Sequence, residues 1–284
     1  MNVKTKAIDF VFVGPMKTGT SWVHEYLALH PSIGVPVRVK ETYYFSKNYC
    51  NGMNWYAKQH ATDSEAIVLG EVSPTYFDSE EVANRIFEHN SNAKVVVTLR
   101  EPLSRFLSHF KHNVRAGIMD ANQNLEDVYR DHRRIRGHSS YVDNIQMWSN
   151  LFGTSNTIVL FNEELEKRPQ SFVNKICRHL GVEEMDIPAT LNKKIGDGRT
   201  PVNARFVKIT KKLVFYLRKL ELHSLVNFVK RTGVGNLLYS KTDAEPPIYA
   251  GIDHVSLRLK TEALRLETEL AIDIEMWREV WEET

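Results

Sequence analysis

Residues 10–22 read FVFVGPMKTGTSW, and the rest of the chain is best understood outward from them. The apolar run Ile8–Val13 has the length of a short buried strand, and Gly14-Pro15 ends it. Apolar residues then recur at helical spacing from Trp22 to Leu29. The stretch therefore predicts a strand, a loop and a helix. In that arrangement the backbone N–H groups and the positive end of the helix dipole favour an anionic phosphate.

The lysine of this loop does not stand where nucleoside-triphosphate enzymes place it. Their pattern puts Lys and then Ser/Thr directly after the second glycine, whereas Thr20 follows Gly19 here and the lysine is Lys17. The predicted strand Val95–Leu99 also ends in Arg100 and not in the aspartate that holds magnesium in many such enzymes. We therefore expect a phosphate ligand without a metal, and a P-loop kinase is the rival interpretation.

Strands and helices alternate along most of the chain. The pattern predicts a strand at Ile67–Leu69, a helix from a capping-box-like Asp78–Glu81 to about Asn90, a strand at Lys94–Leu99, a helix after Pro102, a strand at Thr157–Phe161 and a helix from near Pro169 to Leu180. Short apolar strands between helices indicate a parallel sheet covered on both faces. We expect one α/β domain over residues 1–284, with a mainly helical part at 203–231 and 254–281 and a loop at 232–251.

Composition excludes several classes of protein. A formal net charge of +2 over 284 residues is too small for a nucleic-acid partner. The two cysteines, Cys50 and Cys177, are in no metal-ligand spacing, which argues against disulfides and zinc. The first residues show no signal-peptide pattern and no run approaches the roughly 20 apolar residues of a spanning helix. We expect a cytoplasmic enzyme without a metal, and the sequence does not indicate its oligomeric state.

Residues 15–22, PMKTGTSW, resemble the 5′-phosphosulfate loop of the sulfotransferases that use 3′-phosphoadenosine 5′-phosphosulfate (PAPS). The resemblance implies that PAPS is the sulfuryl donor, that 3′,5′-phosphoadenosine bisphosphate (PAP) is the product, and that Lys17 contacts the bridging and phosphate oxygens. Arg100 and Ser108, eight positions apart, are similar to the family's 3′-phosphate site. The donor-binding residues implied by the loop are Lys17, Thr18, Gly19, Thr20, Ser21 and Trp22.

Residues 40–45, KETYYF, resemble a segment of the glycan-type branch, the heparan sulfate sulfotransferases and their bacterial relatives. The resemblance implies that Glu41 is the general base. A carboxylate within hydrogen-bond reach can take the proton of the attacking hydroxyl or amine, while Lys17 stabilises charge on the departing phosphate oxygen. The acceptor would be a glycan, a glycolipid or a small molecule, entering over Glu41 and residues 120–140. Its expected contacts are Lys40, Tyr44, Ser73 and Tyr76.

Two basic segments are open to more than one interpretation. The polar loop with Lys193, Lys194, Gly196, Gly198 and Arg199 lies where the family often places contacts to the 3′-phosphate. The charged run 130–138, RDHRRIRGH, is either a solvated loop, which we favour, or a surface for an anionic acceptor.

Structural interpretations stand beside the functional ones. Glu41 can be a surface glutamate paired with Lys40, and Arg100 and Ser108 can simply face water. The whole chain can be a non-catalytic nucleotide-binding or scaffolding protein that has kept the donor site. His24 is expected to be structural. One helical stripe is predicted to be core, namely Leu257, Leu259, Leu264, Leu266, Leu270 and Ile274.

Overall fold

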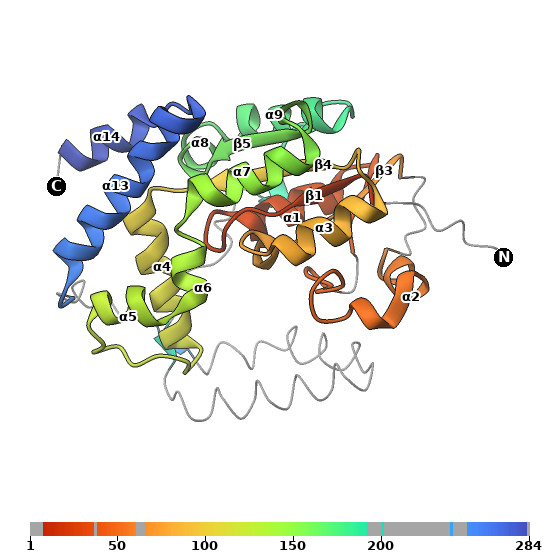
Figure 1. The fold of residues 1–284 in the computed structure, drawn as a ribbon. Coiled ribbons are helices and arrows are strands. Elements are labelled where there is room, and N and C mark those ends of the chain that lie inside the picture. Colours follow the sequence, from red (N-terminus) through yellow and green to blue (C-terminus); the bar gives the residue numbers. More distant parts are fainter. Residues whose placement is uncertain are drawn as a thin grey trace.

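The computed structural model describes residues 8–36, 39–60, 66–191, 200–201, 239–240 and 249–282. Its centre is a five-stranded parallel sheet with the order β2-β3-β1-β4-β5 (Figure 1), as the alternating pattern predicted. The strands are β1 (Phe10–Phe12), β2 (Ile33–Gly34), β3 (Val68–Val72), β4 (Lys94–Leu99) and β5 (Thr157–Phe161). A separate antiparallel pair consists of β6 (Thr200–Pro201) and β7 (Tyr239–Ser240).

Helices connect the strands and form the C-terminal part of the described chain. They are α1 (Thr20–Leu29), α2 (Gly52–Gln59), α3 (Glu80–His89), α4 (Pro102–Arg115), α5 (Leu125–Asp131), α6 (Arg133–Gly137), α7 (Tyr141–Phe152), α8 (Asn162–Lys167), α9 (Pro169–Leu180), α13 (Ile252–Leu270) and α14 (Glu275–Glu282). Short 3₁₀ turns are η1 (Tyr49–Asn51), η2 (Pro74–Tyr76), η3 (Thr154–Asn156) and η4 (Ala189–Leu191). Within these described ranges, none of the helices has the combined length and apolar character needed to cross a membrane.

Both faces of the sheet are buried under helices. Successive side chains of a strand point to opposite faces, so neighbouring residues of β1 belong to different core clusters. Phe10 and Phe12 pack into one core cluster with α1 and α9. Val11 and Val13 pack into another with α3, α7 and α14. Figure 1 shows α3 and α7 together over the same side of β1 and β4. This two-sided cover explains why the strands are continuous apolar runs.

The strand order determines where a ligand can bind. Strand β1 lies between β3 and β4. The helix after β1, α1, covers one face, and the helix after β3, α3, covers the other. Connections that leave in opposite directions open a crevice at the carboxyl ends of parallel strands. The loops after β1, β3 and β4 meet at this edge.

The prediction of a solvated loop at residues 130–138 is wrong. The run forms the end of α5 and the whole of α6, and its Ile135 and His138 are buried. A residue distant in sequence stabilises this helical segment. The buried Arg105 of α4 donates to the Ile135 carbonyl (3.2 Å) and to the Ser139 hydroxyl (2.6 Å). The arginines of the run are solvent-exposed, as expected.

The predicted leucine stripe of the C-terminal helix is only half right. Leu259, Leu266 and Ile274 are buried, whereas Leu257 is 68% and Leu264 37% exposed. Two residues correspond to about 200° around a helix, so these two leucines face away from the buried side. The predicted helix at 203–231 and most of the predicted loop at 232–251 lie outside the described residues.

Candidate active site

The loop between β1 and α1 contains two residues with left-handed backbone conformation. Gly19 is the N-cap of α1 with φ of 82°, and Lys17 has φ of 78°. A Cβ at position 19 would lie 2.7 Å from Cδ2 of Leu165 and 2.8 Å from Oδ1 of Asn162, so α8 packs directly on the loop. The Thr18 hydroxyl donates to the Pro15 carbonyl at 2.8 Å and closes the loop from within.

The backbone N–H groups of this loop are available to a ligand. Within the described part of the chain, no hydrogen bond occupies the N–H groups of residues 17–21. The first N–H groups of a helix have no intrahelical partner and form a ready site for an anion. The predicted phosphate loop therefore has the backbone geometry that phosphate binding needs.

Four cationic side chains gather at this loop. The pKa of Lys17 is lowered to about 8, by burial first and then by the positive charges of Arg115, Arg100 and Lys40, in that order of size. Lys17 forms no ion pair with any residue that the structure describes. The charges that act on Lys17 are all positive, and such a cluster fits a ligand with several negative charges, such as the two phosphates and the sulfate of PAPS.

Arg100 and Ser108 approach the loop from β4 and α4. Arg100 directly follows β4, and its carbonyl accepts a hydrogen bond from the Tyr141 hydroxyl at 2.8 Å. Ser108 and Arg115 are seven residues apart, which is close to two helical turns, so they share one face of α4. Because Arg115 acts on Lys17, this is the face of α4 that looks toward the loop. Arg115 was not predicted from the sequence, although its seven-residue offset from Ser108 is a usable signal.

The start of α4 is fixed by its own cap and by the far end of the chain. The Glu101 carboxylate accepts from the N–H groups of Leu103 (3.1 Å) and Ser104 (2.6 Å). Nε1 of Trp281, in α14, donates to the same carboxylate at 3.2 Å. The position of Arg100, one residue earlier, thus depends on the C-terminal helix.

Lys40 connects the donor loop to the segment that carries Glu41. Its ammonium group donates to the hydroxyls of Thr20 (3.1 Å) and Ser21 (3.2 Å), at the first turn of α1. Burial lowers the pKa of Lys40. Lys40 therefore joins the segment of Glu41 to the start of α1.

Glu41 lies in a partly buried environment beside hydroxyl groups and positive charges. Burial raises the pKa of its carboxyl group, an effect opposed by the charge of Lys40 and by a 3.2 Å hydrogen bond from the Thr75 hydroxyl. The positive charge of Arg134 acts in the same direction as Lys40. A raised pKa makes a carboxylate a better proton acceptor, which is a property of a general base.

Three of the predicted acceptor contacts are buried. Tyr44 is 2% exposed and stacks on Tyr56, with ring centroids 4.6 Å apart. Ser73 and Tyr76 are fully buried, and the Tyr76 hydroxyl accepts from the Phe45 N–H at 3.2 Å. These side chains build the floor under residues 40–45 instead of reaching a surface.

A buried carboxyl group lies in the same floor. Glu71, at the end of β3, is fully buried and accepts from the Thr42 hydroxyl at 2.5 Å. Burial raises its pKa to about 7. The hydroxyl of Thr42 thus ties the segment with Glu41 to the central sheet.

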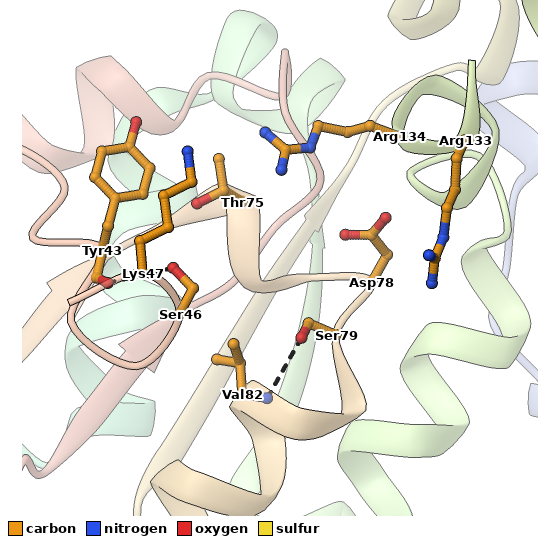
Figure 2. A pocket seen from close by; sticks show the side chains of 9 residues that line it. All are labelled: Tyr43, Ser46, Lys47, Thr75, Asp78, Ser79, Val82, Arg133 and Arg134. Carbon is orange, nitrogen blue, oxygen red and sulfur yellow. Dashed lines mark hydrogen bonds between the residues drawn. The ribbon is translucent and has the colours of Figure 1, made fainter. Parts of the chain in front are cut away.

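A cavity of about 330 Å³ opens beside Glu41; we call it the basic cavity. Figure 2 shows its lining, in which Arg134 reaches toward Thr75 while Lys47 and Tyr43 lie on the opposite side. Thr75 belongs both to this wall and to the hydrogen bond with Glu41. The lining residues are Tyr43, Ser46, Lys47, Thr75, Asp78, Ser79, Val82, Arg133 and Arg134.

The remaining predicted donor contacts differ in what the structure says of them. Trp22 packs on Tyr26, with ring centroids 6.0 Å apart, and its Nε1 donates to the Leu191 carbonyl at 3.1 Å. That bond fixes the chain just before the predicted polar loop. Lys193, Lys194, Gly196, Gly198 and Arg199 themselves lie outside the described residues.

Comparison with known proteins finds a matching domain family, several sequence relatives and a solved structure with a similar fold. Residues 7–194 match the sulfotransferase domain family. The membrane-associated sulfotransferase kil1 of Dictyostelium discoideum is 36% identical over 147 residues, which are 48% of this chain and 31% of that protein. The human bifunctional heparan sulfate N-deacetylase/N-sulfotransferase 2 is 29% identical over 192 residues, 61% of this chain and 22% of that protein. The chain thus spans less than a third of the length of these two relatives.

A solved structure shares the whole architecture. The sulfotransferase from Alicyclobacillus acidocaldarius superimposes with a TM-score of 0.65 and 20% sequence identity, covering 96% of this chain and 99% of the other. This similarity confirms the predicted α/β fold. The family match and the heparan sulfate N-deacetylase/N-sulfotransferase relatives confirm the resemblance to sulfotransferases of the glycan-type branch. Because the family match extends over more than half of its length, this chain belongs to the sulfotransferase domain family.

Proposed function

We propose that the protein transfers a sulfuryl group from PAPS to a hydroxyl or amine of an acceptor bound in the basic cavity. One observation carries this proposal: Lys40, the neighbour of Glu41, donates to Thr20 at the loop where the charges of Arg100 and Arg115 act on Lys17. Membership of the sulfotransferase domain family supports it.

PAPS, when bound, supplies a sulfuryl group on a good leaving group. The chain's part on the donor side is to hold negative charge. The N–H groups of residues 17–21 and the ammonium of Lys17 would hold the 5′-phosphosulfate, and Arg100 with Ser108 would hold the 3′-phosphate. Lys17 also stabilises the charge that develops on the departing phosphate oxygen, because a fixed cation in a partly buried site needs no reorganisation during the reaction.

Glu41 is assigned as the base on the acceptor side. Its carboxylate takes the proton of the attacking group, and the Thr75 hydroxyl holds it in place while lowering its pKa. Burial acts against Thr75 and keeps the carboxylate basic enough to accept a proton. Lys40 keeps Glu41 ionised between turnovers by its charge.

The basic cavity favours an acceptor that carries a negative group near its reacting hydroxyl or amine. Its lining has three cationic side chains, Lys47, Arg133 and Arg134, against the single carboxylate of Asp78. Neither arginine forms an ion pair with another residue in the part of the chain that the structure describes. A glycan acceptor agrees with this chemistry, as heparan sulfate does in the name of the human relative.

Calorimetric titration with PAP, and separately with ATP and magnesium, tests the donor assignment. We expect tight binding of PAP without a metal, weakened about tenfold or more by Arg100→Ala, since a hydrogen bond to a charged group contributes roughly 1.5–3 kcal/mol. Arg178→Ala is a matched control. Arg178 lies in the last turn of α9, beside His179, whose Nε2 is 3.2 Å from the Asn156 carbonyl at the opposite edge of the sheet. Magnesium-dependent ATP binding without PAP binding would replace this proposal by the kinase.

A further inference from the structure

A buried histidine far away in sequence holds the backbone of the phosphate loop. His138 follows α6 and is fully buried. The Met16 N–H, immediately before Lys17, donates to Nδ1 of His138 at 2.9 Å. The predicted functions of donor binding and proton transfer do not use this residue.

The bond to Met16 determines which nitrogen of the ring carries the proton. Nδ1 accepts a hydrogen bond only when it is unprotonated, so the neutral ring carries its proton on Nε2. Nε2 lies 3.3 Å from Oδ1 of Asp78, which is a wall residue of the basic cavity. Burial lowers the pKa of His138, which favours this neutral form. The ring thus lies between the Met16 N–H of the phosphate loop and the Asp78 carboxylate in the wall of the basic cavity.

Other contacts hold the histidine at this position. Arg105 binds Ile135 and Ser139 on either side of it, and the Asn144 side chain donates to the carbonyls of Gly137 (2.8 Å) and Ser140 (2.7 Å). A Cβ at Gly137 would lie 2.5 Å from Oδ2 of Asp78, so the close approach of Asp78 to this segment requires glycine.

The conformation of Lys17 gives the contact its importance. A residue with a Cβ adopts positive φ only where its surroundings over-determine it, and Lys17 has φ of 78°. The peptide before Lys17 is fixed by the bond between Met16 and His138. Because that bond occupies the Met16 N–H, the row of N–H groups available to an anion begins at Lys17.

We propose that His138 is a positioning residue that fixes the Met16 peptide and thereby holds Lys17 and the following N–H groups in the conformation that binds the donor. It acts through the loop and does not touch the ligand. Asp78 orients the ring by facing Nε2. This inference rests on the proposed function in one respect only, which is that PAP is the ligand used to test it.

Two amide substitutions separate the two nitrogens of the ring. In His138→Asn the side-chain oxygen can lie where Nδ1 lies, whereas in His138→Gln the amide reaches the position of Nε2. We expect the Asn variant to bind PAP within about threefold of the natural protein and the Gln variant to bind about tenfold more weakly, as the loss of one hydrogen bond implies. The KM of the donor should follow the same order, with the KM of the acceptor unchanged.

Hydrogen exchange of the Met16 amide gives a readout that needs no ligand. We expect protection in the natural protein and in His138→Asn, and loss of protection in His138→Gln. Equal PAP affinity and equal Met16 protection in the two variants would overturn the positioning role. If the natural protein fails to bind PAP, the donor assignment fails, while the exchange of the Met16 amide still decides the role of His138.

Discussion

At the scale of single residues, Lys17 connects donor binding to pH. Its pKa of about 8 results from burial and then from the charges of Arg115, Arg100 and Lys40. Binding of an anion favours the ammonium form and raises this pKa, so the bound state holds a proton that the free state loses above pH 8. We therefore expect PAP affinity to be constant below about pH 8 and to fall by up to tenfold per pH unit above it.

Calorimetry in steps from pH 6.5 to 9.5 measures this dependence. Lys17→Arg is the matched variant, because a guanidinium stays protonated over the whole range. Its affinity should be lower at neutral pH but independent of pH. The same decline above pH 8 in this variant would assign the titration to another group.

Glu41 leads to a prediction about rate. Glu41→Gln should lower kcat by about 10²–10⁴-fold while PAP affinity stays the same, because only the proton acceptor is lost. The measurement is PAP release with a panel of hydroxyl and amine acceptors, beside PAP titration of the same samples. Full activity of the variant would remove the base assignment.

Thr75 offers a more conservative test of the same carboxylate. Its hydroxyl stabilises the ionised form of Glu41 and lowers its pKa. In Thr75→Val that effect is lost and the pKa of Glu41 rises, so less base is ionised at a given acidic pH. In a plot of kcat/KM against pH, the acidic limb should therefore move to higher pH. The affinity for PAP should stay unchanged.

Local motifs predicted the residues of the loop but not the residues that support it. Residues 15–22 form a contiguous pattern, and Arg100 and Ser108 lie within one strand-helix unit, so a motif can point to them. Arg115 and His138 act through packing between elements, and His138 meets Met16 across 122 positions. Nothing local in the run around His138 distinguishes a buried histidine from an exposed one.

At the scale of elements, the junction of β1 and α1 depends on Gly19. Gly19→Ala should destabilise the fold by about 1–3 kcal/mol, from left-handed strain and from contact with α8. Gly181→Ala is the control. Gly181 has φ of 71° but its Cβ would meet nothing within 4 Å, so only the strain of roughly 1–2 kcal/mol applies.

Urea unfolding gives the two free energies, and PAP titration shows where the effect lies. Donor affinity should fall in Gly19→Ala and stay unchanged in Gly181→Ala. Equal loss of PAP affinity in both variants would mean that the loop is not specifically sensitive to this position.

Elements with a strong internal pattern were predicted closely. Strands β4 and β5 occupy the predicted residues, and α3 begins at Ser79, whose hydroxyl accepts from the Val82 N–H at 3.4 Å. Helix α6 was missed because its five residues are stabilised by Arg105 from another helix. A short charged segment has no pattern of its own that would reveal such support.

At the scale of the whole molecule, we expect the basic cavity to determine which acceptors bind well. It is assembled from residues 43–47, 75–82 and 133–134, which are distant in sequence, and therefore no motif predicted it. Arg134→Ala should lower kcat/KM for anionic acceptors by about two- to fivefold at low salt, the range of a partly exposed ion pair. Neutral acceptors should be affected much less.

The comparison needs matched pairs of acceptors that differ only in a carboxylate or sulfate group. Raising the salt concentration should narrow the difference, because exposed charges are screened. An equal effect of Arg134→Ala on both members of a pair would show that the arginine does not select for charge.

The bond between Trp281 and Glu101 bears on the order in which the protein matures on the ribosome. The sheet and the phosphate loop are made from the first 161 residues, but the cap of α4 gains its last partner only when α14 emerges. Trp277 of the same helix is fully buried, with its ring centroid 5.3 Å from that of Phe161. A chain that has folded its central sheet but not yet α14 therefore lacks this support beside Arg100, and we expect the site proposed for the 3′-phosphate to form only after α14 has packed against Glu101.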